Sequence, residues 1–314
     1  MGRQLAIALL PVLLAGCAGL VPREAPVQGR SERVELADVP FFPQRRYQCG
    51  PAALATVLAY SGIDTSADAL VPEVYLPARK GSLQVELLAA SRRHARVGYV
   101  IEPTLAALVA ELDAGHPVLV LQNLGAVHLP IWHYAVVIGY DSGREQFILR
   151  SGSTRRELLH AGRFAGTWRR GGRWGMLSLR PGEIPGGAQP ARYLESVAAL
   201  ETAGQTAAAR TSYEAAAARW PGEPLAWFAL GNRRLADGGA REAESAFARA
   251  LELAPGDVAA RNNRALLLAR RGCRAEALAE IALAAQRAEH GPLEREVADS
   301  RRTIEATAPG ICTP

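Results

Sequence analysis

Cys49 stands directly before a predicted helix, in the stretch "QRRYQCGPAALATVL" that covers residues 44–58. Proline is favoured in the first helical turn, where its missing N–H is not needed, so Gly50-Pro51 indicates that the helix begins here. Free N–H groups and the positive end of the helix dipole stabilise a thiolate relative to a thiol. We therefore predict that Cys49 is a nucleophile rather than a packing residue.

A thiolate nucleophile needs an imidazole that moves protons. His133 opens the apolar strand pattern "HYAVVIGYD" (133–141), and the start of a strand holds a side chain rigidly. The other histidines fall on surface, turn or helix-end segments: His94, His116, His128, His160 and His290. His133 is therefore the best-placed candidate for the base, with a structural histidine as the alternative.

The sequence pattern around these two residues predicts helices followed by strands. Helices are predicted over 52–60, 83–94 and 105–114, and strands over 117–123, 133–141, 146–151 and 176–180. Three of the strands follow one another closely, which is typical of an antiparallel sheet. The order predicts an α+β domain.

The C-terminal part repeats with a period of 34 residues, as Gly204, Gly238 and Gly272 illustrate. Small residues, bulky residues and helix-ending prolines recur in the same register. The pattern resembles the tetratricopeptide repeat, a helix-turn-helix unit of that length. The resemblance implies an all-α domain that binds a protein or peptide partner, and a rigid spacer is the alternative.

Charge and metal-ligand spacing exclude two classes of function. The net charge is +5, but the arginines are scattered among acidic residues and accompany no nucleic-acid-binding motif, so we predict no nucleic-acid partner. The cysteines and histidines lack a close CxxC or HxxxH spacing. We therefore expect no metal and no other cofactor.

Four segments carry a more specific resemblance: "QCGPAALATVL", "GSLQVELLAASRRHARVGYV", "LDAGHPVLVLQN" and "HYAVVIGYD". Their order across residues 39–151 resembles the bacteriocin-processing, double-glycine-type cysteine peptidases of papain-like fold. The resemblance implies that Cys49 is the nucleophile and His133 the base. It also implies that Gln44 binds the oxyanion, although Gln44 lies one residue closer to the cysteine than is usual. Gln48, adjacent to the cysteine, is less suited.

The family's third residue, an acid or amide that orients the imidazole, falls on Ser151 in "FILRSG". A serine hydroxyl can hold a tautomer by hydrogen bonding but cannot stabilise an imidazolium by charge. Asp141 is the alternative, but it stands at the far end of the histidine's own strand, more than ~20 Å away at roughly 3.3 Å per residue. The sequence therefore favours Ser151.

The N-terminus resembles a bacterial export signal. The apolar run "LAIALLPVLLA" (5–15) follows a positively charged start and is too short to span a bilayer. Leu14-Ala-Gly-Cys17 resembles the lipobox of bacterial lipoproteins, which implies that Cys17 carries a lipid; an ordinary cleaved signal is the alternative. Ala18 replaces the aspartate that would signal inner-membrane retention. We expect the protein on the periplasmic side of the outer membrane of a Gram-negative bacterium.

Cys273 and Cys312 remain once Cys17 and Cys49 are assigned. Because an oxidising periplasm permits disulfides, we predict that these two cysteines pair and fasten the C-terminal tail.

These features divide the chain into segments and predict one main function. The segments are a signal peptide with lipobox (1–17), a tether (18–33), the papain-like domain (34–180), a linker (181–191), the repeats (192–291) and a C-terminal helix and tail (292–314). The predicted function is that of a lipid-anchored cysteine peptidase acting on a peptide or protein. A degenerate peptide-binding module and an acyl or peptidyl transferase on the same fold are the alternatives.

The lipobox makes a direct prediction. Replacing Cys17 by serine should release the exported protein from membranes, because serine lacks the thiol that would carry the lipid. Fractionation of the parent chain and the variant tests this. A Cys17→Ser protein that stays with the membrane as fully as the parent would show that the anchor lies elsewhere.

Overall fold

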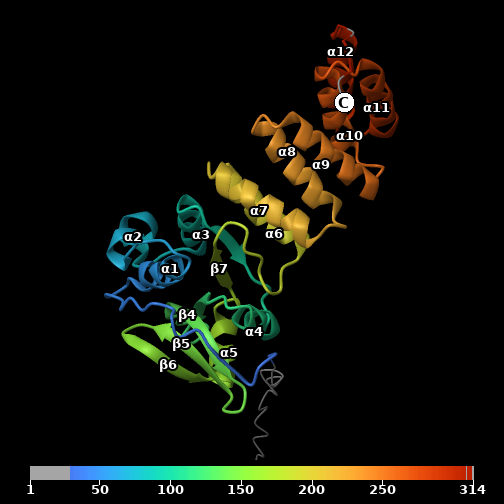
Figure 1. Cartoon of the computed structure of the whole chain (residues 1–314). Coiled ribbons are helices and arrows are strands. Elements are labelled where there is room, and N and C mark those ends of the chain that lie inside the picture. The colour runs from blue at the N-terminus through green and yellow to red at the C-terminus, as the bar shows by residue number, and fades with distance from the viewer. Residues whose placement is uncertain (1–28, 309, 313–314) are drawn as a thin grey trace, which may run out of the picture.

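A computed structural model describes residues 29–308 and 310–312. Cys17 and the predicted signal segment lie outside the described residues. The described chain forms a sheet domain, with helices on both faces, from which an arm of helices extends to the C-terminus (Figure 1). The predicted α+β order, with an all-α region after it, is confirmed.

The strands of the described residues form one antiparallel sheet in the order β2-β7-β3-β4-β5-β6, and β1 pairs with β4. Their bounds are β1 Arg33–Glu35, β2 Val97–Val100, β3 Val118–Asn123, β4 Trp132–Asp141, β5 Gln146–Ser151, β6 Thr154–His160 and β7 Gly175–Leu179. β4 is central: β5 occupies one of its edges, while β3 and then β1 occupy the other.

Helices cover both faces of the sheet, and this explains why β4 is apolar throughout. Tyr134, Val136 and Ile138 belong to a cluster with α1 to α3, whereas Ala135 and Val137 belong to a cluster with α4 and α5. The bounds are α1 Cys49–Tyr60, α2 Ala67–Val74, α3 Gln84–Arg93, α4 Leu105–Asp113 and α5 Ala161–Arg170. Side chains alternate between the faces of a strand, so each face of β4 meets a different helix layer.

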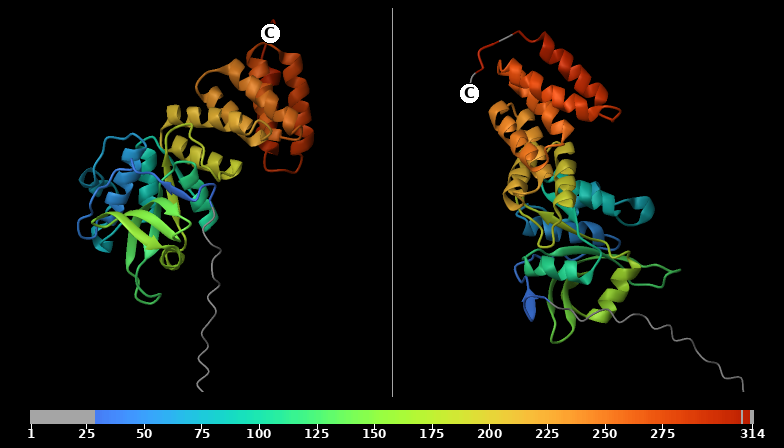
Figure 2. Two further views of the ribbon diagram at one scale, coloured as in Figure 1. Left: turned by 60° about the horizontal axis from the view of Figure 1, so that its bottom comes forward. Right: turned by 90° about the vertical axis from the view of Figure 1, so that its right-hand side faces the viewer.

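The repeat region consists of antiparallel helices that stack into the arm (Figure 2). Their bounds are α6 Pro190–Thr202, α7 Thr206–Arg219, α8 Pro224–Ala236, α9 Ala240–Leu253, α10 Val258–Arg270, α11 Arg274–Ala288 and α12 Glu294–Ala306. Gly204, Gly238 and Gly272 take φ values of +84°, +85° and +83° at the turns between paired helices. A left-handed turn residue favours glycine, which explains the 34-residue period.

The two domains share a core rather than meeting through a loose linker. The cluster on the α4 side of the sheet continues into α6, α7 and α8 through Tyr193, Tyr213 and Leu230. The linker is held by Glu111, a carboxylate that is only 1% exposed. It accepts hydrogen bonds from the backbone of Gly186 (2.8 Å) and Gly187 (3.0 Å) and pairs with His116 at 3.0 Å.

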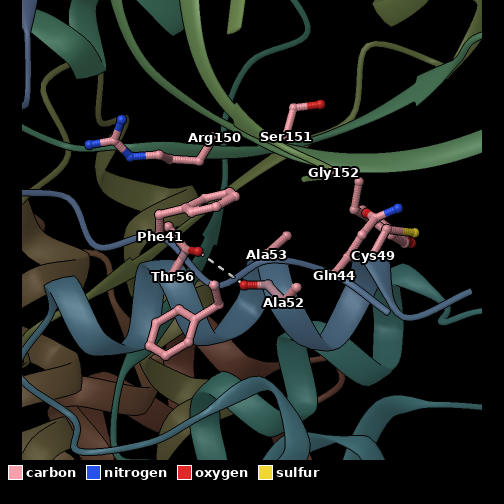
Figure 3. Close-up of a pocket in the computed structure, with 11 residues that line it drawn as sticks. Phe41, Gln44, Cys49, Ala52, Ala53, Thr56, Arg150, Ser151 and Gly152 are labelled. Carbon is pink, nitrogen blue, oxygen red and sulfur yellow. Dashed lines mark hydrogen bonds between the residues drawn. The ribbon is translucent and has the colours of Figure 1, made fainter. Parts of the chain in front are cut away.

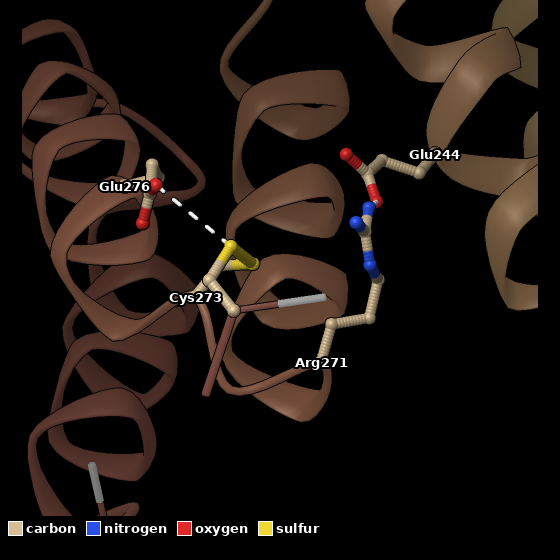
Figure 4. Close-up of a disulfide and its surroundings, with 5 residues drawn as sticks. Glu244, Arg271, Cys273 and Glu276 are labelled. Atoms are coloured by element: carbon tan, nitrogen blue, oxygen red, sulfur yellow. Dashed lines mark hydrogen bonds and ion pairs between the residues drawn. A yellow bond between two sulfur atoms is a disulfide. The ribbon is translucent and has the colours of Figure 1, made fainter. Parts of the chain in front are cut away.

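A disulfide joins Cys273 to Cys312, the pairing predicted from the sequence, and fastens the tail to the start of α11 (Figure 4). Arg271 pairs with Glu244 beside it and connects α9 to the same turn.

The sequence analysis missed several elements of the sheet domain. It did not predict α2, α5, β1, β2 or β6, and it began α1 three residues too late, at Ala52 instead of Cys49. Among the described residues, no helix has the length and apolarity needed to cross a membrane.

Glu111 provides a test of the shared core. Glu111→Ala should lower the free energy of unfolding by about 3 kcal/mol, because buried backbone N–H groups lose their acceptor. Thermal denaturation followed by circular dichroism measures the change. Glu195→Ala, at an exposed position of α6, is the control and should change stability by less than about 0.5 kcal/mol. Equal melting temperatures for the two variants would contradict the assigned role of Glu111.

Candidate active site

Cys49 is the first residue of α1, so the helix begins at the predicted nucleophile. Glycine is required next to it, because a Cβ on Gly50 would lie 2.3 Å from the Ser82 hydroxyl oxygen. Pro51 follows within the first turn, where it removes a backbone N–H that has no helical partner. These residues set the thiol at the end of a helix that packs closely against its neighbours.

The environment of the Cys49 thiol corrects the sequence-based expectation. Burial raises the pKa of the thiol above its ordinary value, and hydrogen bonds from the backbone of Tyr134, Gly50 and Cys49 itself oppose that rise without cancelling it. The helix start was expected to favour thiolate. In the free protein desolvation outweighs the favourable hydrogen bonds, so the thiol form prevails.

His133 lies at the start of β4, next to the residue whose backbone contacts the Cys49 sulfur. Its Nε2 atom lies 3.0 Å from the Ser151 hydroxyl at the end of β5. The predicted contact between His133 and Ser151 is therefore present. Burial lowers the pKa of His133, and the Glu157 carboxylate acts in the opposite direction.

The thiol and the imidazole reach the end of the sheet from different faces. Cys49 packs with the cluster that contains Tyr134, whereas His133 shares the face of Ala135. No hydrogen bond joins the Cys49 sulfur to the ring of His133 within the described residues. Burial favours the neutral form of both groups, so the free site holds a thiol and a neutral imidazole rather than an ion pair.

Gln44 is held beside the nucleophile by the β5–β6 hairpin. Its backbone N–H donates to the carbonyl oxygen of Gly152 at 3.1 Å. Arg150 fixes the preceding segment, because its guanidinium donates to the carbonyl oxygens of Val39 (2.8 Å) and Ala37 (3.1 Å). The segment that precedes the nucleophile is thus attached to the strand that carries Ser151.

One small pocket brings three of the predicted residues together. It is lined by Gln44, Cys49 and Ser151, with Tyr134, Gly152 and Arg150. In Figure 3 the Gln44 amide lies beside the Cys49 sulfur, next to Gly152, while Phe41 and Arg150 lie toward the opposite end. The arrangement places a thiol, an amide donor and a serine-bound imidazole around the same strand ends.

The alternative residues are not brought to this pocket. Asp141 closes the opposite end of β4, where its carboxylate accepts from the backbone N–H of Arg144 at 2.9 Å. Gln48 precedes α1 as its capping residue, but its side chain makes no capping hydrogen bond.

A feature that the sequence analysis missed is the apolar loop between β3 and β4. Its large side chains are exposed: Leu124, Val127, Leu129, Ile131 and, at the strand start, Trp132. The loop leads directly into His133. The signal was in the sequence, because the stretch "LGAVHLPIW" carries no Asp, Glu, Lys or Arg.

In the described part of the chain, Cys273, Glu276 and Cys312 form a group whose potential metal-binding atoms come close together. The two sulfur atoms are bonded to each other as a disulfide, and a disulfide offers no thiolate to a metal.

The hydrogen bond between His133 and Ser151 makes a prediction that a peptide-based alkylating reagent can test, because such a reagent fills the pocket as a substrate would. Ser151→Ala should slow the alkylation of Cys49 by this reagent about fivefold, since a neutral hydrogen bond that orients a base is worth ~1 kcal/mol. Asp141→Asn should leave the alkylation rate unchanged within about a factor of two. A slower rate in Asp141→Asn than in Ser151→Ala would contradict the assignment of the third residue to Ser151.

Solved structures with some likeness to this chain share little of its sequence. A C39-like peptidase from Bacillus anthracis is 18% identical, with 46% of this chain and 96% of that chain covered and a TM-score of 0.40. The peptidase domain of Streptococcus ComA, a bifunctional ABC transporter involved in quorum sensing, is 21% identical, with coverages of 45% and 99% and a TM-score of 0.37. The Yersinia enterocolitica type III secretion chaperone SycD, solved with a peptide of the translocator YopD, is 18% identical, with coverages of 36% and 88% and a TM-score of 0.34.

Family comparisons assign the two parts of the chain. No curated protein matches the chain significantly. Residues 36–174 match the Peptidase C39 like family, and residues 190–233 match the tetratricopeptide repeat. The chain therefore combines a region similar to the Peptidase C39 like family with a region similar to the tetratricopeptide repeat.

Proposed function

We propose that this protein is a cysteine peptidase that cleaves a peptide or protein substrate by acyl transfer to Cys49. The proposal rests on the pocket that Cys49, Gln44 and Ser151 line together. Cys49 stands there at the start of α1, and the Ser151 hydroxyl is hydrogen-bonded to His133. The match of residues 36–174 to a peptidase family supports it.

The reaction follows from the protonation states of the free site. His133 is neutral, so it can accept the proton of the Cys49 thiol as the sulfur attacks the substrate carbonyl. In the tautomer of His133 that carries its proton on Nε2, the Nε2–H group donates a hydrogen bond to the Ser151 oxygen. The Nδ1 atom of that tautomer has a free lone pair and can act as the base. The resulting imidazolium then protonates the leaving amine, and water releases the acyl group from the sulfur.

The oxyanion of the tetrahedral intermediate would be bound by the Gln44 side-chain amide and the backbone N–H of Cys49. One such donor is typically worth about 3 kcal/mol of the activation barrier. Because Cys49 and His133 make no hydrogen bond in the free protein, the proposal requires the two side chains to move together when substrate fills the pocket. Catalytic hydrogen bonds are often longer in unliganded sites.

Further features suggest the kind of substrate and the location. The exposed side chains of the 124–132 loop adjoin His133 and favour substrates with apolar residues near the scissile bond. The Cys273–Cys312 disulfide fits an oxidising compartment, which agrees with an exported protein held at the outer membrane through a lipid on Cys17. The repeats would bind a protein partner or the substrate itself.

An activity-based probe and a peptide library test the proposal. The full chain should be labelled at Cys49 by a thiol-reactive peptide probe and should cleave library peptides, with apolar residues preferred. Cys49→Ala should abolish labelling and cleavage, and His133→Ala should lower cleavage at least about 100-fold, the lower range for general-base catalysis.

The same experiment distinguishes the two alternatives. A folded chain that binds peptides without labelling at Cys49 would be a peptide-binding module, an outcome that the raised pKa of the thiol favours. Acyl products that form with an added amine, at the expense of hydrolysis, would identify a transferase.

A further inference from the structure

The His133 imidazole has a neutral hydrogen-bond partner although it must become positively charged during acyl transfer. Ser151 can hold the ring but carries no charge that would stabilise an imidazolium. The proposed reaction therefore needs another group of this chain whose negative charge stabilises the His133 imidazolium.

The strand register places one carboxylate on the same face of the sheet as His133 and Ser151. Leu149 of β5 pairs with Glu157 of β6, and the register shifts before the next pair, Ser151 with Thr154. Two residues of β5 stand opposite three of β6, so the additional residue lies on β6, and Leu149 and Ser151 keep the same face of β5. Glu157 shares the face of its partner Leu149 and so lies diagonally from Ser151, which contacts His133.

Glu157 is available for this role because nothing in the described residues neutralises it. Its half-buried side chain makes no hydrogen bond or ion pair there, whereas other acidic side chains of this sheet are paired. Glu35 binds Arg156, Asp141 binds Arg144, and Glu145 binds His160.

Other charged or titratable groups stand on the elements around His133. They are Cys49 on α1, His128 in the preceding loop, Arg150 on β5, Arg155 and Arg156 on β6, and Arg163, Arg169 and Arg170 on α5. Arg150 is engaged with backbone carbonyl oxygens and Arg156 with Glu35. Glu157 is the charged group that acts on the pKa of His133, raising it against the effect of burial.

We propose that Glu157 is a positioning residue that stabilises the imidazolium form of His133 through space, in place of the acid that Ser151 replaces. The carboxylate does not touch the substrate or the reacting atoms. The inference rests on the proposed function for its role in turnover, but its electrostatic core, the coupling of Glu157 to His133, does not depend on any substrate.

The test is the titration of His133 by NMR in the full chain with isotope-labelled histidine, the signal being assigned with His133→Gln. Glu157→Gln should lower the pKa of His133 by about 0.5 to 1, the size expected for a charge without direct contact in a partly screened site. In Glu157→Asp, which keeps the negative charge, the pKa of His133 should stay close to that of the parent protein. Glu145→Gln, which removes a carboxylate at the other end of the same hairpin, is the matched control and should leave the pKa unchanged.

The pH profile of peptide cleavage gives the second readout. In Glu157→Gln the acid limb, where His133 must lose its proton to act as base, should move to lower pH, and the maximal rate should fall about three- to tenfold. An unchanged pKa of His133 in folded Glu157→Gln, or an equal shift in Glu145→Gln, would overturn the inference. A pKa that moves as expected in a chain without peptidase activity would support the inference and reject the proposed function.

Discussion

The packing of the first turn of α1 against the first residues of β4 is the contact on which the site depends. It brings the Cys49 sulfur to the backbone of Tyr134, and so places the thiol beside the strand position of His133. Gly50 permits the approach, since a larger residue would collide with Ser82. Arg150 then attaches the segment before α1 to β5, which brings Gln44 and Ser151 to the same pocket.

The same packing removes water from both reactive groups. Desolvation favours the uncharged state of an acid and of a base, so the pKa of the thiol rises and that of the imidazole falls. In such a site the cysteine is favoured as the thiol rather than the thiolate. Its thiol can become a nucleophile only when a proton passes to the ring, and a thiol is less easily oxidised than a thiolate.

Sequence patterns predicted the parts of this molecule whose signals are local. The presence of α1, although not its first residue, follows from Gly50-Pro51 and the apolar run after it, and the 34-residue period follows from glycines that must adopt positive φ. β6 was missed because "TRRELLH" is a charged edge strand without a clear apolar alternation. Glu157 was missed with it, since its relation to Ser151 exists only through the register of two strands. The pKa of Cys49 could not be predicted either, because it depends on burial by residues distant in the sequence.

The core shared by the sheet domain and the first repeats fixes the direction in which the arm leaves the pocket. A polypeptide held on the arm would therefore not diffuse freely around the sheet domain, as it would on a flexible linker. Its free segment would search a restricted volume near Cys49, at an effective concentration that short tethers raise to about the millimolar range. Such an arrangement would select substrates by the number of residues between the segment bound to the arm and the scissile bond, in addition to the sequence around that bond.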